Sequence, residues 1–389
     1  MHPARSLHAG PTWRQDAEGT TIHTTRIAIV GGGLAGIYAA SRLEHCGIRD
    51  YVVLEARNAW GGRIASTPAL AGGSPQDRFD LGPTWFWPAY QPHFAQLVDS
   101  LGLQSFAQPE AGDMLIEQAP GAAPARVAGY ASAPPSMRLS GGMGTLVDAL
   151  RLRLKPENLL LGHRVRRLRS DGQQVVLEVD NTGDGAGAYR ADHVLLAVPP
   201  RLALTLIDFL PSLPAPLASA WRGAATWMAP HAKYVALYDE PFWRAQGLSG
   251  EARSVRGPLG EIHDASMPGG RGALFGFFGT PALVRRSVAA DVLQAHCRAQ
   301  FARLFGERAA TPLADFIKDW AADPWTATAA DENGAGSHGL APAATAAEGP
   351  WKNRLTGIAS EWSRQFPGYL AGAVEAAAEG VDALLEPSS

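Results

Sequence analysis

The spacing of apolar residues predicts a strand, a helix and a second strand within residues 27–54. Residues 27–30 form a short apolar, β-branched run, which is typical of a strand buried in a parallel sheet. Residues 34–46 repeat apolar positions at helical spacing, and residues 51–54 form another apolar run. This order of strand, helix and strand favours an α/β fold built on a parallel sheet.

Farther along the chain, the patterns predict antiparallel strands and several helices. Two runs of alternating apolar and polar residues, 164–168 and 175–179, flank an Asp-Gly turn and predict a hairpin. Pro199 and Pro200 end a buried strand predicted from residue 193, because proline cannot continue a ladder of hydrogen bonds. The Ala/Gly-rich segment 326–349 predicts a loop, of a length typical of a lid. Further strands are predicted near Leu115 and Val127 and at 231–238, 260–265 and 272–278, and helices at 92–101, 143–154 and 289–305 and after Gly368.

Between the first strand and the first helix, Gly31, Gly33 and Gly36 form the pattern G-x-G-x-x-G. The first glycine permits a tight turn, the second allows the backbone to approach a pyrophosphate, and the third allows close packing of helix and strand. The N–H groups at the start of the helix are directed at the phosphate. Glu55 ends the second strand, where a carboxylate accepts hydrogen bonds from ribose hydroxyls. The pattern therefore predicts a dinucleotide with an unphosphorylated adenosine ribose, NAD or FAD, and a purely structural βαβ turn is the alternative.

A second glycine pair distinguishes FAD from NAD. In the string EARNAWGGR at residues 55–63, Gly62 offers another close backbone approach and Arg63 offers a guanidinium for the phosphates. This E-A-R-x-x-x-G-G-R string resembles the flavin amine oxidoreductase family, which includes monoamine oxidases, polyamine oxidases and L-amino-acid oxidases. The resemblance extends in the family's order from residue 26 to about residue 385, through Asp80-Leu81-Gly82, 139–144, K-x-x-x-x-Y-x-x-P-F-W at 233–243, 316–320, 357–361 and G-Y-x-x-G-A at 368–373.

The resemblance implies a fold and a division into domains. The fold is α/β, a Rossmann-like FAD-binding domain of the GR2 type with an inserted substrate domain of sheet and helices. The implied boundaries are an N-terminal arm at 1–25, an FAD-binding domain at 26–85, 137–224 and 321–389, and a substrate domain at 86–136 and 225–320.

The resemblance also implies which residues bind FAD. Val165 would contact the adenine, and the helix that begins after Gly368 would point its N-terminus at the flavin O2 carbonyl, where reduction builds negative charge. The complete set is Gly31, Gly33, Leu34, Ala35, Gly36, Glu55, Ala56, Arg57, Gly62, Arg63, Gly82, Pro83, Thr84, Val165, Trp320, Glu361, Gly368, Tyr369, Leu370 and Ala373.

Three residues acquire catalytic roles from the resemblance. Lys233 matches the lysine that holds a water near flavin N5, Trp320 matches the tryptophan that packs on the isoalloxazine, and Tyr369 matches one wall of an aromatic cage for the amine. From residue types alone, the alternatives are a lysine that extends to solvent and aromatic side chains that pack in the core. The candidates to line the substrate site are Trp85, Trp87 and Trp325.

The chain departs from the family at three points. The region of the second cage wall, 328–330, carries no aromatic residue. Monoamine oxidases attach FAD through a cysteine in the region of 326–330, where this chain has none, so FAD is expected to be non-covalent. The stretch 83–87 lacks the arginine that clamps a carboxylate in L-amino-acid oxidases, which favours an amine without an α-carboxylate, although Arg364 is a candidate replacement.

Composition excludes other classes of partner. The net charge of −3 gives no electrostatic footprint for nucleic acid or for an anionic membrane. The only cysteines, Cys46 and Cys297, form neither a disulfide framework nor a metal-binding spacing, and the histidines form no ligand set, so no metal site is expected. Residues 1–25 lack the apolar run of a signal peptide or membrane span. We therefore expect a soluble, cytoplasmic protein, and an oligomer is compatible with the sequence.

These observations predict FAD-dependent oxidation of an amine. A hydride passes from the amine α-carbon to flavin N5, the imine is hydrolysed, and dioxygen is reduced to hydrogen peroxide. Two alternatives stay open at this point. One is a flavin dehydrogenase or desaturase that uses an electron acceptor other than oxygen, and the other is a non-catalytic FAD-binding partner subunit.

Overall fold

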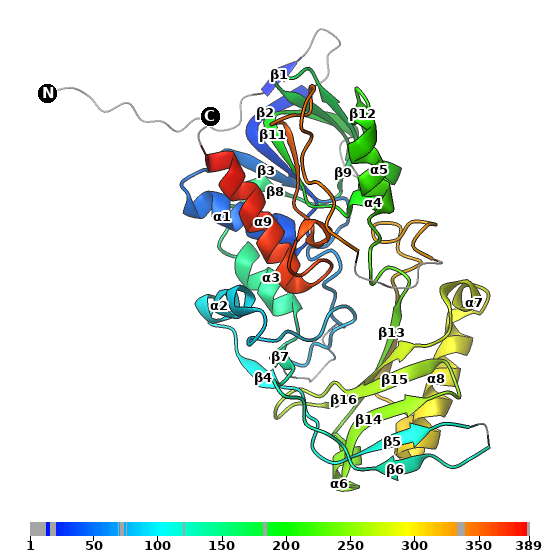
Figure 1. The fold of residues 1–389 in the computed structure, drawn as a ribbon. Coiled ribbons are helices and arrows are strands. Elements are labelled where there is room, and N and C mark those ends of the chain that lie inside the picture. The colour runs from blue at the N-terminus through cyan, green and yellow to red at the C-terminus, as the bar shows by residue number, and fades with distance from the viewer. Residues whose placement is uncertain are drawn as a thin grey trace, which may run out of the picture.

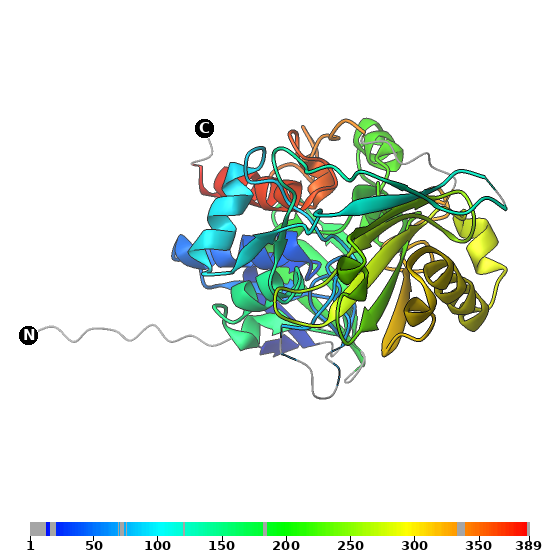
Figure 2. The same cartoon turned by 90° about the horizontal axis from the view of Figure 1, so that it is seen from below.

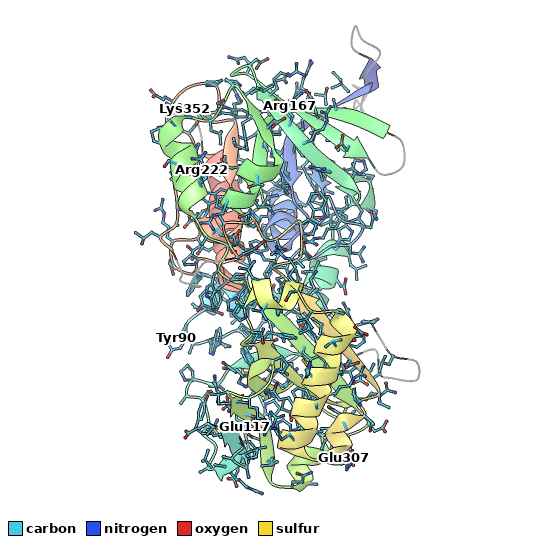
Figure 3. All side chains as sticks on the ribbon, turned by 90° about the vertical axis from the view of Figure 1, so that its right-hand side faces the viewer. Tyr90, Glu117, Arg167, Arg222, Glu307 and Lys352 are labelled. Carbon is cyan, nitrogen blue, oxygen red and sulfur yellow. The ribbon has the colours of Figure 1, made fainter. Side chains whose placement is uncertain are left out.

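The computed structural model describes residues 13–15, 21–68, 70, 74, 76–119, 121–181, 185–332 and 339–386 of the chain. Two lobes are stacked along the long axis of the molecule, each built around one sheet (Figure 1). Figure 3 shows side chains filling both lobes, with Arg167 in the lobe of the larger sheet and Glu117 in the other. None of the helices in the described ranges is long and apolar enough to cross a membrane.

The larger lobe contains a nine-stranded mixed sheet. Its central strands β11, β2, β3 and β8 are mutually parallel along the segments that pair, and β9, β10 and the first half of β11 form an antiparallel meander. The strands are β1 Trp13–Gln15, β2 Thr21–Val30, β3 Tyr51–Leu54, β8 Leu159–Leu160, β9 His163–Ser170, β10 Val175–Asn181, β11 Gly185–Leu196, β12 Asp208–Leu210 and β18 Leu355–Gly357.

Successive residues of β2 pack alternately against the two layers that cover the sheet of this lobe. Ile27 and Ile29 pack on one side against the helices α1 (Leu34–His45), α3 (Gly144–Arg151) and α9 (Leu370–Leu385). Ala28 and Val30 face the opposite layer, where apolar residues of the meander are buried. Because both faces are covered there, the segments 27–30, 51–54 and 194–196 of the central strands are apolar, as buried parallel strands usually are.

The smaller lobe contains a seven-stranded sheet. Helix α8 (Ala290–Phe305) covers one face (Figure 2). There Phe301 packs edge-on against Tyr234. The opposite face, with Val235 and Phe275, packs against Phe79 of the larger lobe. In spatial order the strands are β17 Ala314–Asp319, β13 Ala232–Tyr238, β16 Gly272–Phe278, β15 Leu259–Asp264, β14 Leu248–Ser254, β5 Asp113–Glu117 and β6 Ala125–Val127.

Short elements connect and cap the two sheets. They are α2 Pro92–Ser100, β4 Ser105–Ala107, β7 Met137–Leu139, η1 Pro156–Asn158, α4 Pro200–Leu206, α5 Ala215–Gly223, α6 Phe242–Ala245, α7 Ala282–Arg286, η2 Glu307–Ala310 and η3 Ser360–Trp362.

A buried arginine joins the lobes. Arg138, on β7, is 1% exposed, and its guanidinium donates hydrogen bonds to the carbonyl oxygens of Asp264, Ala265 and Ser266 at the end of β15. Burial lowers the pKa of this guanidinium, and the nearby Asp80 acts in the opposite direction. The contact fixes the smaller sheet against the chain segment that leads back into the larger lobe.

The predicted fold class is confirmed, and several elements agree closely with the sequence patterns. Strands β3 and β16 have the predicted limits, whereas α3 ends at Arg151, three residues early. Strand β14 and helices α4 and α5 were not predicted.

The predicted limit of the N-terminal arm cuts through a strand. Strand β2 begins at Thr21, before residue 26, and β1 pairs with it. Residues 1–12 and 16–20 of the arm lie outside the described residues. Each sheet draws its strands from the segments assigned to one domain, apart from this extension, but the division into domains stays a prediction.

Candidate active site

A cavity of about 750 Å³ lies where the two lobes meet. Its lining includes every residue predicted for the site except Gly36 and Glu361. The residues brought together are Gly31, Gly33, Leu34, Ala35, Glu55, Ala56, Arg57, Gly62, Arg63, Gly82, Pro83, Thr84, Trp85, Trp87, Val165, Lys233, Trp320, Trp325, Gly368, Tyr369, Leu370 and Ala373.

At one end, the glycine-rich turn shapes the cavity wall. Gly31 has a φ of +108°, a conformation that side-chain-bearing residues rarely adopt. A Cβ on Gly36 would lie 2.0 Å from the carbonyl oxygen of Gly31, so Gly36 permits the close packing of α1 on the turn. Gly36 therefore supports the site from behind, which explains why it does not line the cavity.

Gly33 shows that this end fits a bound dinucleotide. Its φ is −75°, and a Cβ there would come no closer than 3.7 Å to any protein atom outside its chain neighbours, so neither conformation nor packing demands glycine. Gly33 lines the cavity and precedes α1, whose first N–H groups receive no side-chain cap. The absent side chain leaves room for a group that approaches the backbone, and the uncapped N–H groups favour an anion.

Glu55 is fixed at the end of β3. Its Oε2 accepts a hydrogen bond from the Gly32 N–H at 2.6 Å, and its Oε1 accepts one from the Arg57 N–H at 2.8 Å. Burial raises the pKa of Glu55, while these two N–H groups act to lower it. Glu55 is thus held with a carboxylate edge at the cavity, as recognition of ribose hydroxyls requires.

Arg63, which was predicted to meet the phosphates, and Arg57, which was predicted to bind FAD, are each paired with an acid. Arg57 Nη1 lies 2.8 Å from Asp323, and Arg63 makes a bidentate contact with Glu361 at 2.5 and 3.0 Å. Glu361 therefore lies behind Arg63 and does not line the cavity. Because the arginine charges are largely neutralised, helix N-termini are the stronger candidates to meet an anion.

A second helix N-terminus meets the same cavity. Helix α9 follows Gly368, whose φ is +83°, and its N-cap residue Tyr369 provides no side-chain cap. Gly368, Tyr369, Leu370 and Ala373 all line the cavity. The N-termini of α1 and α9 thus place two positive dipole ends along one elongated space.

Lys233 projects from β13 across the junction of the lobes. Its Nζ donates to Thr84 Oγ1 at 2.5 Å and to the Gly82 carbonyl at 3.2 Å, and it lies 3.9 Å from the centre of the Phe275 ring. Lys233 is 2% exposed, which contradicts the alternative of a lysine extending to solvent. Burial lowers the pKa of this ammonium, and the charge of Asp80 acts to raise it.

Asp80 balances Lys233 from within the larger lobe. One carboxylate oxygen accepts a hydrogen bond from the Met143 N–H at 2.7 Å, whereas the other is buried without a hydrogen-bond partner. Burial raises the pKa of Asp80, and the charges of Lys233 and Arg138 act to lower it. The Asp-Leu-Gly turn therefore contributes a buried acid that is electrostatically coupled to the site lysine.

Aromatic rings form the walls near Tyr369. The Trp87 ring stands edge-on to Tyr369 with centroids 6.4 Å apart, and the Trp227 ring is tilted against Tyr369 at 5.4 Å. Trp85 lies against Phe275 and donates its indole N–H to Gln108. Trp227, and no residue of 328–330, therefore places a second aromatic ring beside Tyr369 on the cavity wall.

Trp325 lies elsewhere than expected. The Arg164 guanidinium lies over the Trp325 ring, with its carbon 5.5 Å from the ring centre. Arg164 is next to Val165 on β9. Thr326, the neighbour of Trp325, accepts a hydrogen bond from Arg57. Trp325 thus belongs to the end of the cavity with Glu55 and Val165, and it does not join Trp85 and Trp87.

The sequence patterns missed Trp227, Met228 and His231, which line the cavity from the turn between α5 and β13. This turn carries neither a periodic pattern nor a glycine motif, so only its tryptophan could have drawn attention. His231 holds Trp320 in place by accepting its backbone N–H, and burial lowers the pKa of the imidazole.

Comparisons with known proteins bear on this geometry. Residues 121–385 match the family of flavin containing amine oxidoreductases. The chain belongs to this family. Residues 29–101 also match an NAD(P)-binding Rossmann-like domain.

Individual relatives agree with the family assignment. The chain is 30% identical over 190 residues to a probable flavin-containing monoamine oxidase A of Dictyostelium discoideum, covering 47% of this chain and 39% of that protein. It is 28% identical over 260 residues to the putrescine oxidase of Kocuria rosea, covering 62% of this chain and 52% of that protein. The chain thus spans about half or less of the length of these relatives. The cyclohexylamine oxidase of Brevibacterium oxydans has the same fold, with a TM-score of 0.74, 20% identity and coverage of 92% of this chain and 98% of that one.

Metal ligands are not part of the site. Across the described ranges, no group of three or more His, Cys, Asp or Glu side chains is placed to hold a metal ion.

Proposed function

We propose that this protein is an amine oxidase that binds FAD without a covalent bond. One observation carries the proposal. A single cavity joins the glycine turn and Glu55 at one end to Lys233 and the rings of Tyr369, Trp87 and Trp227 at the other. A dinucleotide held at the first end would extend toward the second, where a small amine has aromatic surfaces to pack on.

The residues present fit FAD. The cradle at Gly33, the uncapped N-terminus of α1 and the carboxylate of Glu55 would hold the pyrophosphate and ribose, and Val165 with Trp325 would flank the adenine. When bound, FAD would accept a hydride from the amine α-carbon at N5 and pass the electrons to dioxygen, which yields an imine and hydrogen peroxide.

Side chains and helix N-termini of the protein would support amine oxidation by their position and their charge. The N-terminus of α9 favours negative charge near Tyr369, and Trp320 is fixed by its indole N–H bond to the Leu81 carbonyl. Lys233, anchored by Thr84, presents an ammonium that would orient a water molecule at the reacting edge of the flavin. Tyr369, Trp87 and Trp227 would exclude bulk water from the amine and hold it unprotonated.

Cysteine placement supports non-covalent binding. Cys46 is exposed at the far end of α1, and Cys297 is buried in α8 among core residues of the smaller lobe. Neither lines the cavity. Acid precipitation of the purified protein should therefore release all of its flavin.

Cation placement supports a substrate without an α-carboxylate. Arg364 is exposed and does not line the cavity, so it does not replace the missing arginine of 83–87. Among the cationic side chains of the cavity lining only Lys233 is buried, and it is committed to Thr84 and Gly82.

A panel of amines tests the proposal. Purified protein mixed with amines in the absence of air should lose its flavin absorbance with at least one amine, and air should restore the colour with one equivalent of peroxide. A protein that binds FAD and is reduced by no amine would instead be a non-catalytic partner subunit. A protein that is reduced but returns slowly in air would be a dehydrogenase.

A further inference from the structure

The turn 224–231, which joins α5 to β13, carries part of the cavity wall. Trp227, Met228 and His231 of this turn line the cavity, and the Trp227 ring packs on Tyr369. Figure 1 shows the chain descending from α5, beside α4, to β13. The turn belongs to neither sheet, so no ladder of strand hydrogen bonds fixes its place. Other contacts must hold it.

Two cavities adjoin the Trp227 side chain. Trp227 is half-buried, and besides the main cavity it lines a small one of about 20 Å³. Ala224, Ala225 and Leu340 also line the small cavity; the first two are small, and Leu340 is 97% exposed. Close packing is what fixes a side chain in a protein core, and here there is space beside the ring. The backbone at Trp227 therefore has to be held if the ring is to keep its place.

A buried carboxylate holds the backbone just before Trp227. Asp331 is 2% exposed, and its Oδ1 accepts a hydrogen bond from the Thr226 N–H at 3.2 Å. Its Oδ2 accepts two hydrogen bonds from Thr328, one from the N–H at 2.9 Å and one from Oγ1 at 2.7 Å. Asp331 therefore ties the turn to the neighbouring segment 328–331.

Arg201, on α4, extends this contact to the end of α5. Its Nη1 donates to Asp331 Oδ1 at 2.5 Å, its Nε to the Arg222 carbonyl at 3.0 Å and its Nη2 to the Gly223 carbonyl at 3.3 Å. The rigid, planar fork of an arginine suits several acceptors at fixed angles. Arg201 and Asp331 together fix the chain at the point where it leaves α5.

The far end of the turn is held by a different arginine. Arg285 of α7 is 3% exposed, and its Nη2 donates to the Pro230 carbonyl at 2.8 Å. The start of β13 therefore stays anchored when the first part of the turn is released. A change at Asp331 should thus act mainly on the neighbourhood of Trp227.

We propose that Asp331 and Arg201 are positioning residues that hold the Trp227 ring in place and so set the width of the amine chamber. Neither Asp331 nor Arg201 lines the cavity, so both act through Trp227. The proposal rests on the proposed amine oxidase function, because the place of this ring matters to the reaction only if an amine lies beside it.

Asp331→Asn is the main test variant. Each carboxylate oxygen of Asp331 accepts from two donors, whereas an amide offers one oxygen and presents an NH2 group to the donors of the other. Either Thr328 or the pair of Arg201 and Thr226 then faces a donor, so one side of the contact is lost.

Arg201→Lys is the milder second variant. An ammonium keeps the positive charge beside Asp331, but it lacks the planar fork that reaches two carbonyl oxygens as well. It decides the question if Asp331→Asn, which leaves a largely buried guanidinium without its acid, does not fold.

Fluorine NMR reads the position of the ring directly, without substrate or flavin. The protein is prepared with fluorinated tryptophan, and the resonance of Trp227 is the one that disappears in Trp227→Leu. Asp331→Asn should shift or broaden this resonance and leave that of Trp243, which donates to Asp264 in the smaller lobe, unchanged. Arg201→Lys should act in the same direction and more weakly.

Two amines of different size read the width of the chamber. The ratio of kcat/KM for naphthylmethylamine to that for benzylamine is the readout, because a ratio cancels any general loss of active protein. Asp331→Asn should raise the ratio about threefold or more, since a released ring yields to the larger substrate. In the Trp227→Leu background the same change should move the ratio less than about twofold, because it acts through the ring that is absent.

Asp315→Asn is the matched control. Asp315 on β17 accepts from Arg298 and from the Tyr234 hydroxyl, and it does not line the cavity. Its loss should lower the melting temperature, as the loss of Asp331 does, because an acid is removed from a partly buried pair. It should leave the Trp227 resonance in place and the ratio of the two amines within about twofold.

The outcomes separate this proposal from the proposed function. An unchanged Trp227 resonance in Asp331→Asn and Arg201→Lys would overturn the proposal, because packing on Tyr369 and His231 would then suffice to hold the ring. A ratio that does not move, or that moves equally in Asp315→Asn, would also overturn it and leave amine oxidation standing. If no amine reduces the flavin, the proposed function fails, and the Trp227 resonance alone decides whether the ring is held by this contact.

Discussion

The two ends of the cavity are built in different ways. The end with Glu55 is made of backbone, through glycines and helix N–H groups supplied mostly by residues 31–63. The chamber around Tyr369 is made of side chains that come from separate segments, including Trp87, Trp227 and Lys233. The first end depends on the absence of side chains and the second on their presence.

This difference predicts which end of the cavity tolerates a change of residue type. A pyrophosphate needs close backbone approach, which leaves few residue choices at each position. A chamber wall needs only an apolar surface at the right place, and any nearby segment can provide it. We therefore expect substitutions at the two ends to affect different measurements.

The largest effect is expected within the glycine turn, where two similar substitutions should act differently. Gly36→Ala brings a Cβ to 2.0 Å from the Gly31 carbonyl oxygen, so we expect a loss of about 3 kcal/mol or more in the free energy of unfolding. Gly33→Ala meets no protein atom closer than 3.7 Å, so the flavin-free protein should keep its melting temperature within a few degrees. Gly33→Ala should instead weaken FAD binding about tenfold or more. Equal melting temperatures for both variants would contradict this division.

The next effect concerns Lys233. Lys233→Met should retain FAD and slow flavin reoxidation by oxygen by about tenfold or more, because a preorganised positive charge is removed. Lys318→Met is the matched control, since Lys318 is the neighbour of Lys233 on β17 but pairs with Asp323 and does not line the cavity. Stopped-flow mixing of the reduced proteins with air measures both rates, and unchanged reoxidation in Lys233→Met would reject the assignment.

A reciprocal pair of tryptophan variants sharpens the comparison further. Trp227→Leu removes a ring that packs on Tyr369 and should lower kcat/KM for the best amine about tenfold, with little change in FAD affinity. Trp325→Leu removes a ring next to Arg164 and should weaken FAD affinity with little change in the KM of the amine. If Trp325→Leu raised the KM of the amine and left FAD affinity unchanged, Trp325 would line the substrate site, as the sequence predicted.

The smallest effect concerns the larger lobe alone. Burial lowers the pKa of His193 to about 4, and its ring contacts Asn353 O through Nδ1 and Thr356 Oγ1 through Nε2. Because the unfolded chain binds this proton below pH about 6.5 and the folded chain does not, stability is fully present above that pH and falls as pH drops toward 4. His193→Gln should flatten this loss by about 1 to 2 kcal/mol between pH 7 and 5, measured by urea unfolding. An unchanged pH profile would contradict a neutral buried imidazole.

Elements formed by local sequence signals could be predicted, and elements that depend on distant segments could not. The βαβ unit could be predicted because its signals are local, such as the apolar run of β2 and the glycines after it. Strand β14, with the sequence LSGEARS, was missed because Gly250 and the polar residues Ser249, Glu251 and Arg253 interrupt its pattern. Its place between β15 and β5 depends on pairing with distant segments, which no local pattern reports.

The site shows the same limit at single residues. Gly33 and Glu55 were predicted from spacing along the chain, and the cavity contains both. Trp227 was missed because a turn without periodicity places it against Tyr369. The contact of Trp325 with Arg164 was also not predicted, because only tertiary structure brings Arg164 onto its ring. The pairing of Arg63 with Glu361 joins residues 298 positions apart and likewise lay beyond the sequence.

Arg138 has a consequence for how molecules reach the interior. Its buried guanidinium donates to the carbonyl oxygens of Asp264, Ala265 and Ser266, so hinging the two lobes apart would break all of these charge-assisted hydrogen bonds together. Each hydrogen bond to a charged group contributes about 1.5 to 3 kcal/mol, so the separation is opposed by several kcal/mol. Traffic into and out of the protein should therefore proceed by rotation of rim side chains, with the two halves moving as one rigid block.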